Sequence, residues 1–215
     1  PERVAVLVNN PTYYGICSDL RAIVQMAHDA GMLCLADEAH GTHFYFGGGL
    51  PVSAMAAGAD MAAVSMHKSG GSLTQSSLLL IGPNVHAGYV RQIINLTQTT
   101  SGSYLLMSSL DISRRNLALR GRKVSIIADM AEYAREEINA VGGYYAFGKE
   151  LCNGNSVFDF DTTKLSVHTL DIGLAGIEHD ILRDEYDIQI EFGDIGNILA
   201  YLPSATPQEV ERLRV

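Results

Sequence analysis

Residues 65–72 read Ser-Met-His-Lys-Ser-Gly-Gly-Ser, and they begin where a short apolar run at 61–65 ends. Upstream, residues 33–40 read Leu-Cys-Leu-Ala-Asp-Glu-Ala-His, in which polar residues again end an apolar run. Short, continuous apolar runs of this kind are typical of strands that are buried on both faces of a sheet. The pattern therefore places a lysine, Lys68, just past one predicted strand and an aspartate, Asp37, just past another.

Helical segments separate the predicted strands. Apolar residues repeat on one helical face within residues 17–30, a short helix is predicted at 51–57, and strands are predicted at 4–8 and 32–36. The order strand, helix, strand, helix, strand requires parallel strands, and right-handed crossovers place their carboxyl ends along one edge of the sheet. Ligands bind at that edge in open α/β sheets. We therefore expect Asn10, Asp37 and Lys68 to converge there.

The rest of the chain extends this α/β pattern. An apolar run at 76–81 is too close to Lys68 for a helical crossover, so it should form a strand antiparallel to the others. The predicted fold class is α/β: a mostly parallel sheet with flanking helices in residues 1–141, followed by a small α/β domain in residues 142–215. The other predicted elements are helices at 89–96, 104–119, 122–140, 177–184 and from Thr206, and strands at 144–147, 165–170, 188–192 and 198–202.

Composition argues against several classes of function. Asp and Glu number 24 against 15 Lys and Arg, and the net charge of -9 disfavours binding to nucleic acid or to an anionic membrane. No apolar run approaches the ~18 residues of a membrane span, and no secretory signal opens the chain. The three cysteines are widely spaced and odd in number, which favours reduced thiols and a cytoplasmic protein. Because the sequence opens without a methionine, we expect it to be a fragment.

The lysine and the aspartate together indicate pyridoxal phosphate. This cofactor needs a lysine amine to form a Schiff base and a carboxylate to hold its ring nitrogen protonated, which Lys68 and Asp37 would supply. A lysine on a surface loop is the other interpretation, but an aspartate at the neighbouring strand end disfavours it. His40 lies three residues beyond Asp37, close enough to meet the ring. Ser65 and His67 flank the lysine and can donate hydrogen bonds to a phosphate.

Two other interpretations of this region have less support. The Asp-Glu-Ala-His sequence that begins at Asp37 also occurs in helicases, but the Gly-x-x-x-x-Gly-Lys-Ser/Thr phosphate loop is missing from this sequence. His40 and His43, with Glu38 nearby, could suggest zinc, but a further ligand is not evident. The sequence therefore predicts no metal site.

Three motifs carry a resemblance to a known family. They are Asn-Pro-Thr-Tyr-Tyr-Gly-Ile at 10–16, Ala-Asp-Glu-Ala-His-Gly at 36–41 and Ser-Met-His-Lys-Ser at 65–69. With Leu-Thr-Gln-Ser at 73–76, the chain resembles the Orn/Lys/Arg decarboxylases, pyridoxal-phosphate enzymes of the aspartate-aminotransferase fold type. The resemblance covers the second half of the large cofactor domain and then a small domain. A ring-stacking histidine and a phosphate-binding loop precede this region in the family, and neither occurs in this sequence.

The resemblance also implies roles for individual residues. Lys68 would carry the cofactor, Asp37 would pair with the pyridinium nitrogen, and His40 would lie near the phenolic oxygen. The remaining cofactor-binding residues implied by the resemblance are Ser65 and His67 at the phosphate, and Thr74. The family's active sites lie at homodimer interfaces, so Thr74 is expected to reach the cofactor of the partner subunit.

The implied activity is that of a lyase. It is the pyridoxal-phosphate-dependent decarboxylation of a basic amino acid (lysine, ornithine or arginine) to the amine and carbon dioxide, a reaction of amino-acid metabolism and polyamine biosynthesis. Two alternatives stay open. One is another reaction of the same cofactor, such as transamination or carbon-sulfur lysis, and the other is a non-catalytic fragment without a complete cofactor site.

Overall fold

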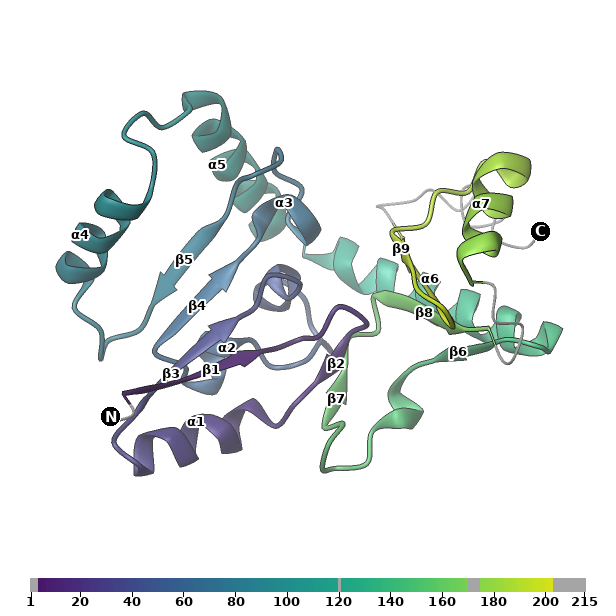
Figure 1. Cartoon of the computed structure of the whole chain (residues 1–215), viewed down its shortest axis with the longest axis horizontal. Coiled ribbons are helices and arrows are strands. Elements are labelled where there is room, and N and C mark those ends of the chain that lie inside the picture. Colours follow the sequence, from purple (N-terminus) through teal and green to yellow (C-terminus); the bar gives the residue numbers. More distant parts are fainter. Residues whose placement is uncertain (1–3, 120, 170–174, 203–215) are drawn as a thin grey trace. The chain divides into compact units, whose positions relative to one another are not determined.

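The structure is a computed structural model that describes residues 4–119, 121–169 and 175–202 (Figure 1). The described residues form two compact units. The first comprises residues 4–13, 17–47, 51–119 and 121, and the second comprises residues 14–16, 48–50, 122–169 and 175–202. Each unit has its own four-stranded sheet.

The first unit is built on a mostly parallel sheet, as predicted. Its strands are β1 (Ala5–Asn9), β3 (Leu33–Asp37), β4 (Met61–Val64) and β5 (Leu78–Ile81), in the spatial order β1-β3-β4-β5. The first three are parallel, and β5 runs antiparallel to β4. Asp37 is paired with Asn9 on one side and with Ala63 on the other. The carboxyl ends of the parallel strands therefore share one edge, and the α/β fold class is confirmed.

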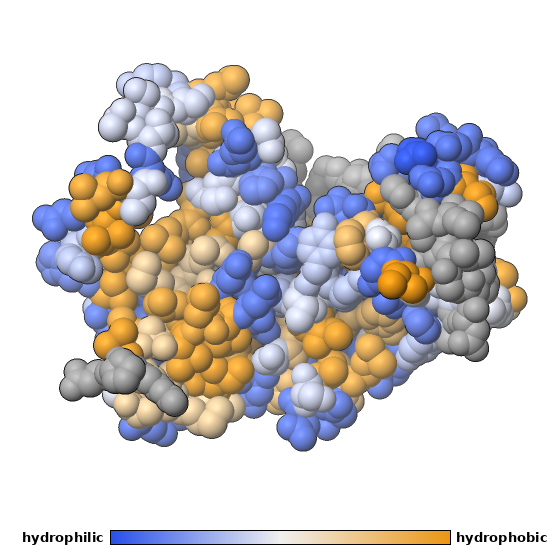
Figure 2. All heavy atoms as spheres, in the orientation of Figure 1, coloured by the Kyte–Doolittle hydropathy of each residue, from blue (hydrophilic) through white to orange (hydrophobic). Residues whose placement is uncertain are grey.

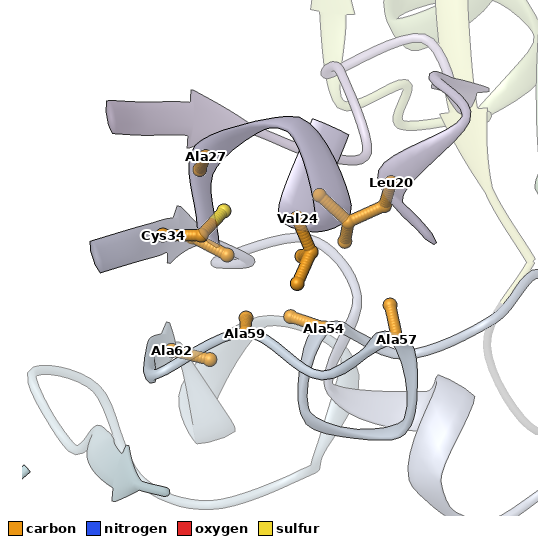
Figure 3. Close-up of a cluster of buried hydrophobic side chains, with 9 residues drawn as sticks. Leu20, Val24, Ala27, Cys34, Ala54, Ala57, Ala59 and Ala62 are labelled. Atoms are coloured by element: carbon orange, nitrogen blue, oxygen red, sulfur yellow. The ribbon is translucent and has the colours of Figure 1, made fainter. Parts of the chain in front are cut away.

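One face of this sheet is covered by α1 (Leu20–Asp29) and α2 (Ala54–Ala57). Leu20 and Val24 of α1 point toward the alanines of α2 and the loop that follows it (Figure 3). Most residues of this cluster are alanines, which lets the helices lie close to the sheet. The predicted helix start at Cys17 is wrong, because Cys17 lies in β2 (Ile16–Cys17) and the Asp19 side chain caps α1 by accepting from Ala22 N at 3.1 Å. The buried core comprises Leu20, Val24, Ala27, Cys34, Ala36, Ala54, Ala57, Ala59 and Ala62.

The other face of the same sheet is exposed in the described structure. Successive side chains of a strand point to opposite faces, so Leu7, Asp37 and Leu79 share the face that α1 and α2 do not cover. Leu7 is 74% exposed and Leu79 is 39% exposed. Figure 2 shows apolar atoms gathered over the strands β1, β3 and β4 of Figure 1. Asp37 therefore projects from an apolar, uncovered sheet face.

Short and long helices follow the sheet strands in this unit. The turn after β4 forms α3 (Met66–Ser69), and η1 (Thr42–Tyr45) lies between β3 and α2. After β5 come α4 (Ala87–Thr97) and α5 (Tyr104–Leu119), and the bounds of α5 are those predicted. Across the described residues, no helix has the length and hydropathy needed to cross a membrane.

The second unit combines helices with an antiparallel sheet. The sheet has the order β6-β8-β10-β9, and α6 packs on β6 and β8. A further strand, β7, pairs with β2, and neither of these two strands was predicted. The domain boundary predicted after residue 141 stays a prediction. The elements are α6 (Arg122–Val141), β6 (Tyr145–Phe147), η2 (Lys149–Leu151), β7 (Asp159–Phe160), β8 (Lys164–His168), α7 (Ala175–Tyr186), β9 (Phe192–Gly193) and β10 (Asn197–Tyr201).

The predicted strand at 188–192 is wrong over most of its length. Only Phe192 belongs to β9. Asp187 has a positive φ of 55°, and Ile188 N donates to Leu182 O at 2.8 Å, so this segment closes the end of α7 before any strand pairing begins. Ile190 is buried against Ile198, which explains the apolar pattern without a strand. The predicted helix from Thr206 lies outside the described residues.

Candidate active site

Lys68 lies in the turn that follows the central strand β4. Ser65 keeps the extended backbone of the strand, and Lys68 N then donates to Ser65 O at 3.1 Å, which begins the short helix α3. Gly70 is the C-cap of α3, and glycine is needed there because a Cβ would lie 2.6 Å from Met66 O. The Lys68 side chain is exposed. Its Nζ lies 3.0 Å from Nε2 of His40, so the amine contacts the loop that follows β3.

Asp37 is the last residue of β3. Its main-chain oxygen accepts from Asn10 N at 3.0 Å, and its Oδ1 accepts from Ala39 N at 3.1 Å. The Asp37 side chain is exposed, whereas Asn10 is buried and accepts from Ser18 N at 2.8 Å through its Oδ1. The predicted convergence therefore holds for Asn10 and Asp37. Asn10 supports the strand end, and Asp37 presents its carboxylate.

His40 is the link between the two strand ends. It is buried, and its ring meets Tyr13 edge-on, with centroids 4.4 Å apart and an interplanar angle of 86°. An ammonium donates hydrogen bonds and cannot accept them, so Lys68 Nζ donates to Nε2 of His40. His40, which is predicted to lie near the cofactor ring, therefore contacts Lys68.

The remaining predicted residues lie on α3 and on the loop after it. Nδ1 of His67 donates to Ser76 O at 3.0 Å, and the His67 backbone N donates to the same oxygen at 3.2 Å. Ser65 occupies the N-cap position of α3, but within the described chain its hydroxyl makes no capping hydrogen bond. Thr74 is exposed and precedes Gln75, which has a positive φ of 64°. The structure thus brings Ser65 and His67 next to Lys68 and leaves Thr74 on an exposed loop.

The side chains that could suggest zinc from the sequence do not point to a common centre. Glu38 is turned away toward Tyr45 and α2, and His43 is buried with its ring beside Phe44, centroids 4.8 Å apart. Among the residues that the structure describes, no group of three His, Cys, Asp or Glu side chains could hold a metal ion.

Glu38 lies at the same strand end, although the sequence predicts no cofactor role for it. Its side chain is fully buried, with Oε1 accepting from Ala54 N at 2.8 Å and Oε2 accepting from the Tyr45 hydroxyl at 2.5 Å. Burial raises the pKa of the Glu38 carboxyl to about 7, and the two hydrogen bonds offset part of that rise. Burial, and then the nearby Glu38 carboxylate, raise the pKa of Tyr45 as well. The sequence hints at the burial of Glu38 only through its position, because it directly follows the strand that ends at Asp37.

Comparison with known proteins places the chain in a family. Residues 2–172 match the family described as Orn/Lys/Arg decarboxylase, major domain. The chain belongs to the Orn/Lys/Arg decarboxylase family. The resemblance predicted from the three motifs is therefore confirmed.

The relatives of this family member include two proteins that are named arginine decarboxylase. The one from Halalkalibacterium halodurans is 46% identical over 202 residues, covering 93% of this chain and 41% of that protein. The one from Bacillus subtilis is 41% identical over 219 residues, covering 99% of this chain and 44% of that protein. The chain thus spans less than half the length of these relatives. Among solved structures, the constitutive lysine decarboxylase of E. coli matches with a TM-score of 0.76 at 17% identity. The match covers 98% of this chain and 35% of that chain, and at this identity it shows a shared fold.

Proposed function

We propose that this chain carries part of a pyridoxal-phosphate site in a protein that decarboxylates a basic amino acid. The observation that carries this proposal is the 3.0 Å contact between Lys68 Nζ and His40 Nε2, beside Asp37 at the carboxyl edge of the sheet. Arginine is the favoured substrate, because the two relatives at 41% and 46% identity are named arginine decarboxylases. The products would be the corresponding amine and carbon dioxide.

The side chains at this edge fit the chemistry of that cofactor. Lys68 is an exposed primary amine that would hold the cofactor's aldehyde carbon, and Asp37 is an exposed carboxylate that would pair with the ring nitrogen. Ser65 and His67 are hydrogen-bond donors for the phosphate. Oγ of Ser69 is buried and makes no hydrogen bond among the described residues, which is unfavourable for a hydroxyl. A further group bound at this turn would supply the missing partner.

When bound, pyridoxal phosphate supplies an electron sink that permits loss of the substrate carboxylate as carbon dioxide. Asp37 would hold the proton at the ring nitrogen, because its carboxylate is negative and projects from the strand end. Lys68 Nζ is the atom that can return a proton to the substrate carbon, and Nε2 of His40 orients it from 3.0 Å. Tyr13 packs against the His40 ring and restricts its orientation.

His67 imposes a condition on phosphate binding. Its Nδ1 already donates to Ser76 O at 3.0 Å, so Nε2 is the ring atom that would face a phosphate. A neutral imidazole carries one N–H group, and that group is used at Nδ1. A hydrogen bond from Nε2 to the phosphate would therefore require a proton on each ring nitrogen.

The proposal also includes a homodimer. Thr74 lies on an exposed loop, and we propose that this loop reaches the cofactor of a partner subunit in a homodimer. Replacement of Thr74 by alanine in one subunit of a mixed dimer should then weaken cofactor binding in the opposite subunit.

Labelling of the lysine tests the cofactor site. We would titrate the purified chain with pyridoxal phosphate, reduce it with borohydride and map the labelled peptide. Label on Lys68, and loss of near-visible absorbance in the variant Lys68→Ala, would support the proposal. Lys149→Ala is the matched control, because the Lys149 side chain is 53% exposed and lies in the second unit. Labelling spread evenly over all lysines, or absent from the wild type, would contradict the site.

The reaction is tested separately with arginine, lysine and ornithine. Release of carbon dioxide that requires Lys68 would support a decarboxylase, and the substrate that reacts fastest identifies the specificity. Formation of a keto acid without carbon dioxide would indicate an aminotransferase. Absence of both, with no cofactor bound, would favour a non-catalytic fragment.

A further inference from the structure

We propose that Glu38 is a positioning residue, which holds the loop between β3 and α2 so that His40 meets Lys68. This inference rests on the proposed function in one respect, namely that Lys68 is the reacting amine. Three sets of contacts hold this loop, all of them within the first unit.

The first contact closes the loop at both ends. Glu38 directly follows β3, and its carboxylate accepts from Tyr45 at the end of η1 and from Ala54 N at the start of α2. The Tyr45 hydroxyl in turn accepts from Met55 N at 3.4 Å. One buried side chain therefore connects the strand that carries Asp37, the far end of the loop and the next helix.

The second contact fits the loop around the Glu38 side chain. A Cβ at Gly41 would lie 2.7 Å from Cγ of Glu38 and 2.9 Å from Cδ of Pro11. Only glycine permits this approach, and Gly41 N also donates to Glu38 O at 2.9 Å. His40 lies between these two residues in sequence, so its backbone is held on both sides.

The third contact ties the loop to the turn that carries the lysine. The Thr42 hydroxyl donates to Ser65 O at 3.1 Å, and the same carbonyl oxygen accepts from Lys68 N at 3.1 Å. The loop and the turn thus share Ser65 O as an acceptor, and the His40–Lys68 contact is a second link between them. Loss of the Glu38 side-chain hydrogen bonds should free the loop and weaken the contact between His40 and Lys68.

Acetylation of lysines in the chain without added cofactor tests this coupling. The measured quantity is the rate at Lys68 relative to Lys149, obtained by peptide mass spectrometry. Glu38→Ala and His40→Ala should each raise this ratio by about 2- to 10-fold, the range expected when an ordinary hydrogen bond to the amine is lost. The double variant should show no more than either single change, because both act through the same contact.

Three controls separate positioning from loss of fold. Glu38→Gln keeps an oxygen that can accept from Ala54 N, and its amide N–H can donate to the Tyr45 hydroxyl oxygen, so this variant should retain the wild-type ratio. Tyr45→Phe, which removes one hydroxyl, should give a smaller rise than Glu38→Ala. Asp60→Asn alters another buried acid, just before β4 begins, and should leave the ratio unchanged. An unchanged ratio in Glu38→Ala, or multiplied effects in the double variant, would overturn the proposal. Because this assay contains no cofactor, its result is independent of the labelling test of the proposed function.

Discussion

Replacement of Glu38 by glutamine should change how the stability of the protein depends on pH. The pKa of the Glu38 carboxyl is about 7 in the folded chain, against 4.5 without burial. Between those two values the folded state holds a proton that the unfolded state has lost, so stability falls as the pH rises through this window. Each unit of difference is worth about 1.4 kcal/mol, which gives a total effect of about 3 kcal/mol. Glutamine does not titrate, so the variant lacks this loss.

Urea unfolding at pH 5 and pH 8, followed by circular dichroism, measures the effect. The unfolding free energy of Glu38→Gln minus that of the wild type should be about 2 to 3 kcal/mol larger at pH 8 than at pH 5. Other titrating groups, such as Asp60, are present in both proteins and cancel in this difference. A difference that is the same at the two pH values would refute the inference that Glu38 is buried and protonates near neutrality.

Three further predictions concern other parts of the first unit. The Asp60 carboxylate accepts from Cys34 N at 2.8 Å and from Asn84 Nδ2 at 3.0 Å, and its pKa is lowered although burial opposes this. Its contribution is present above the ordinary aspartate range and is lost as the pH falls, so Asp60→Asn should cost about 1 to 3 kcal/mol in urea unfolding at pH 7 and less at pH 3. Leu20 is fully buried, and Leu20→Ala should cost about 2 to 5 kcal/mol in the same assay, whereas an unchanged midpoint would contradict the described core. His67→Ala should weaken the binding of pyridoxal phosphate more than that of pyridoxal, and equal losses for the two compounds would remove His67 from the phosphate site.

Much of the first unit was predictable because its strands are short apolar runs that end in polar residues. The strand ends at Asp37 and before Lys68 followed from that pattern, and so did the antiparallel direction of β5, which depends on the length of one connection. The pattern failed where apolar residues are buried without pairing, as at Ile190. It also failed at Cys17, where the N-cap at Asp19 sets the start of the helix.

Side-chain contacts within the site were harder to predict than the positions of its residues. His40 was expected near the ring because of its distance from Asp37 in sequence, but its 3.0 Å contact with Lys68 depends on how the loop folds back. That fold depends in turn on Glu38 and Gly41, whose close approach is a matter of three-dimensional packing. An acid that follows an exposed aspartate is usually expected to be solvated, so the position of Glu38 directly after a buried strand was the one hint of its burial.

The uncovered sheet face has a consequence for experiments in solution. Leu7 and Leu79, on the two edge strands of the sheet, are both exposed on the face that α1 and α2 do not cover in the described part of the chain. Dyes that fluoresce on apolar protein surfaces should therefore bind the native chain. A bright dye signal at low temperature is expected of the folded chain, and melting curves based on such dyes would start from a high baseline.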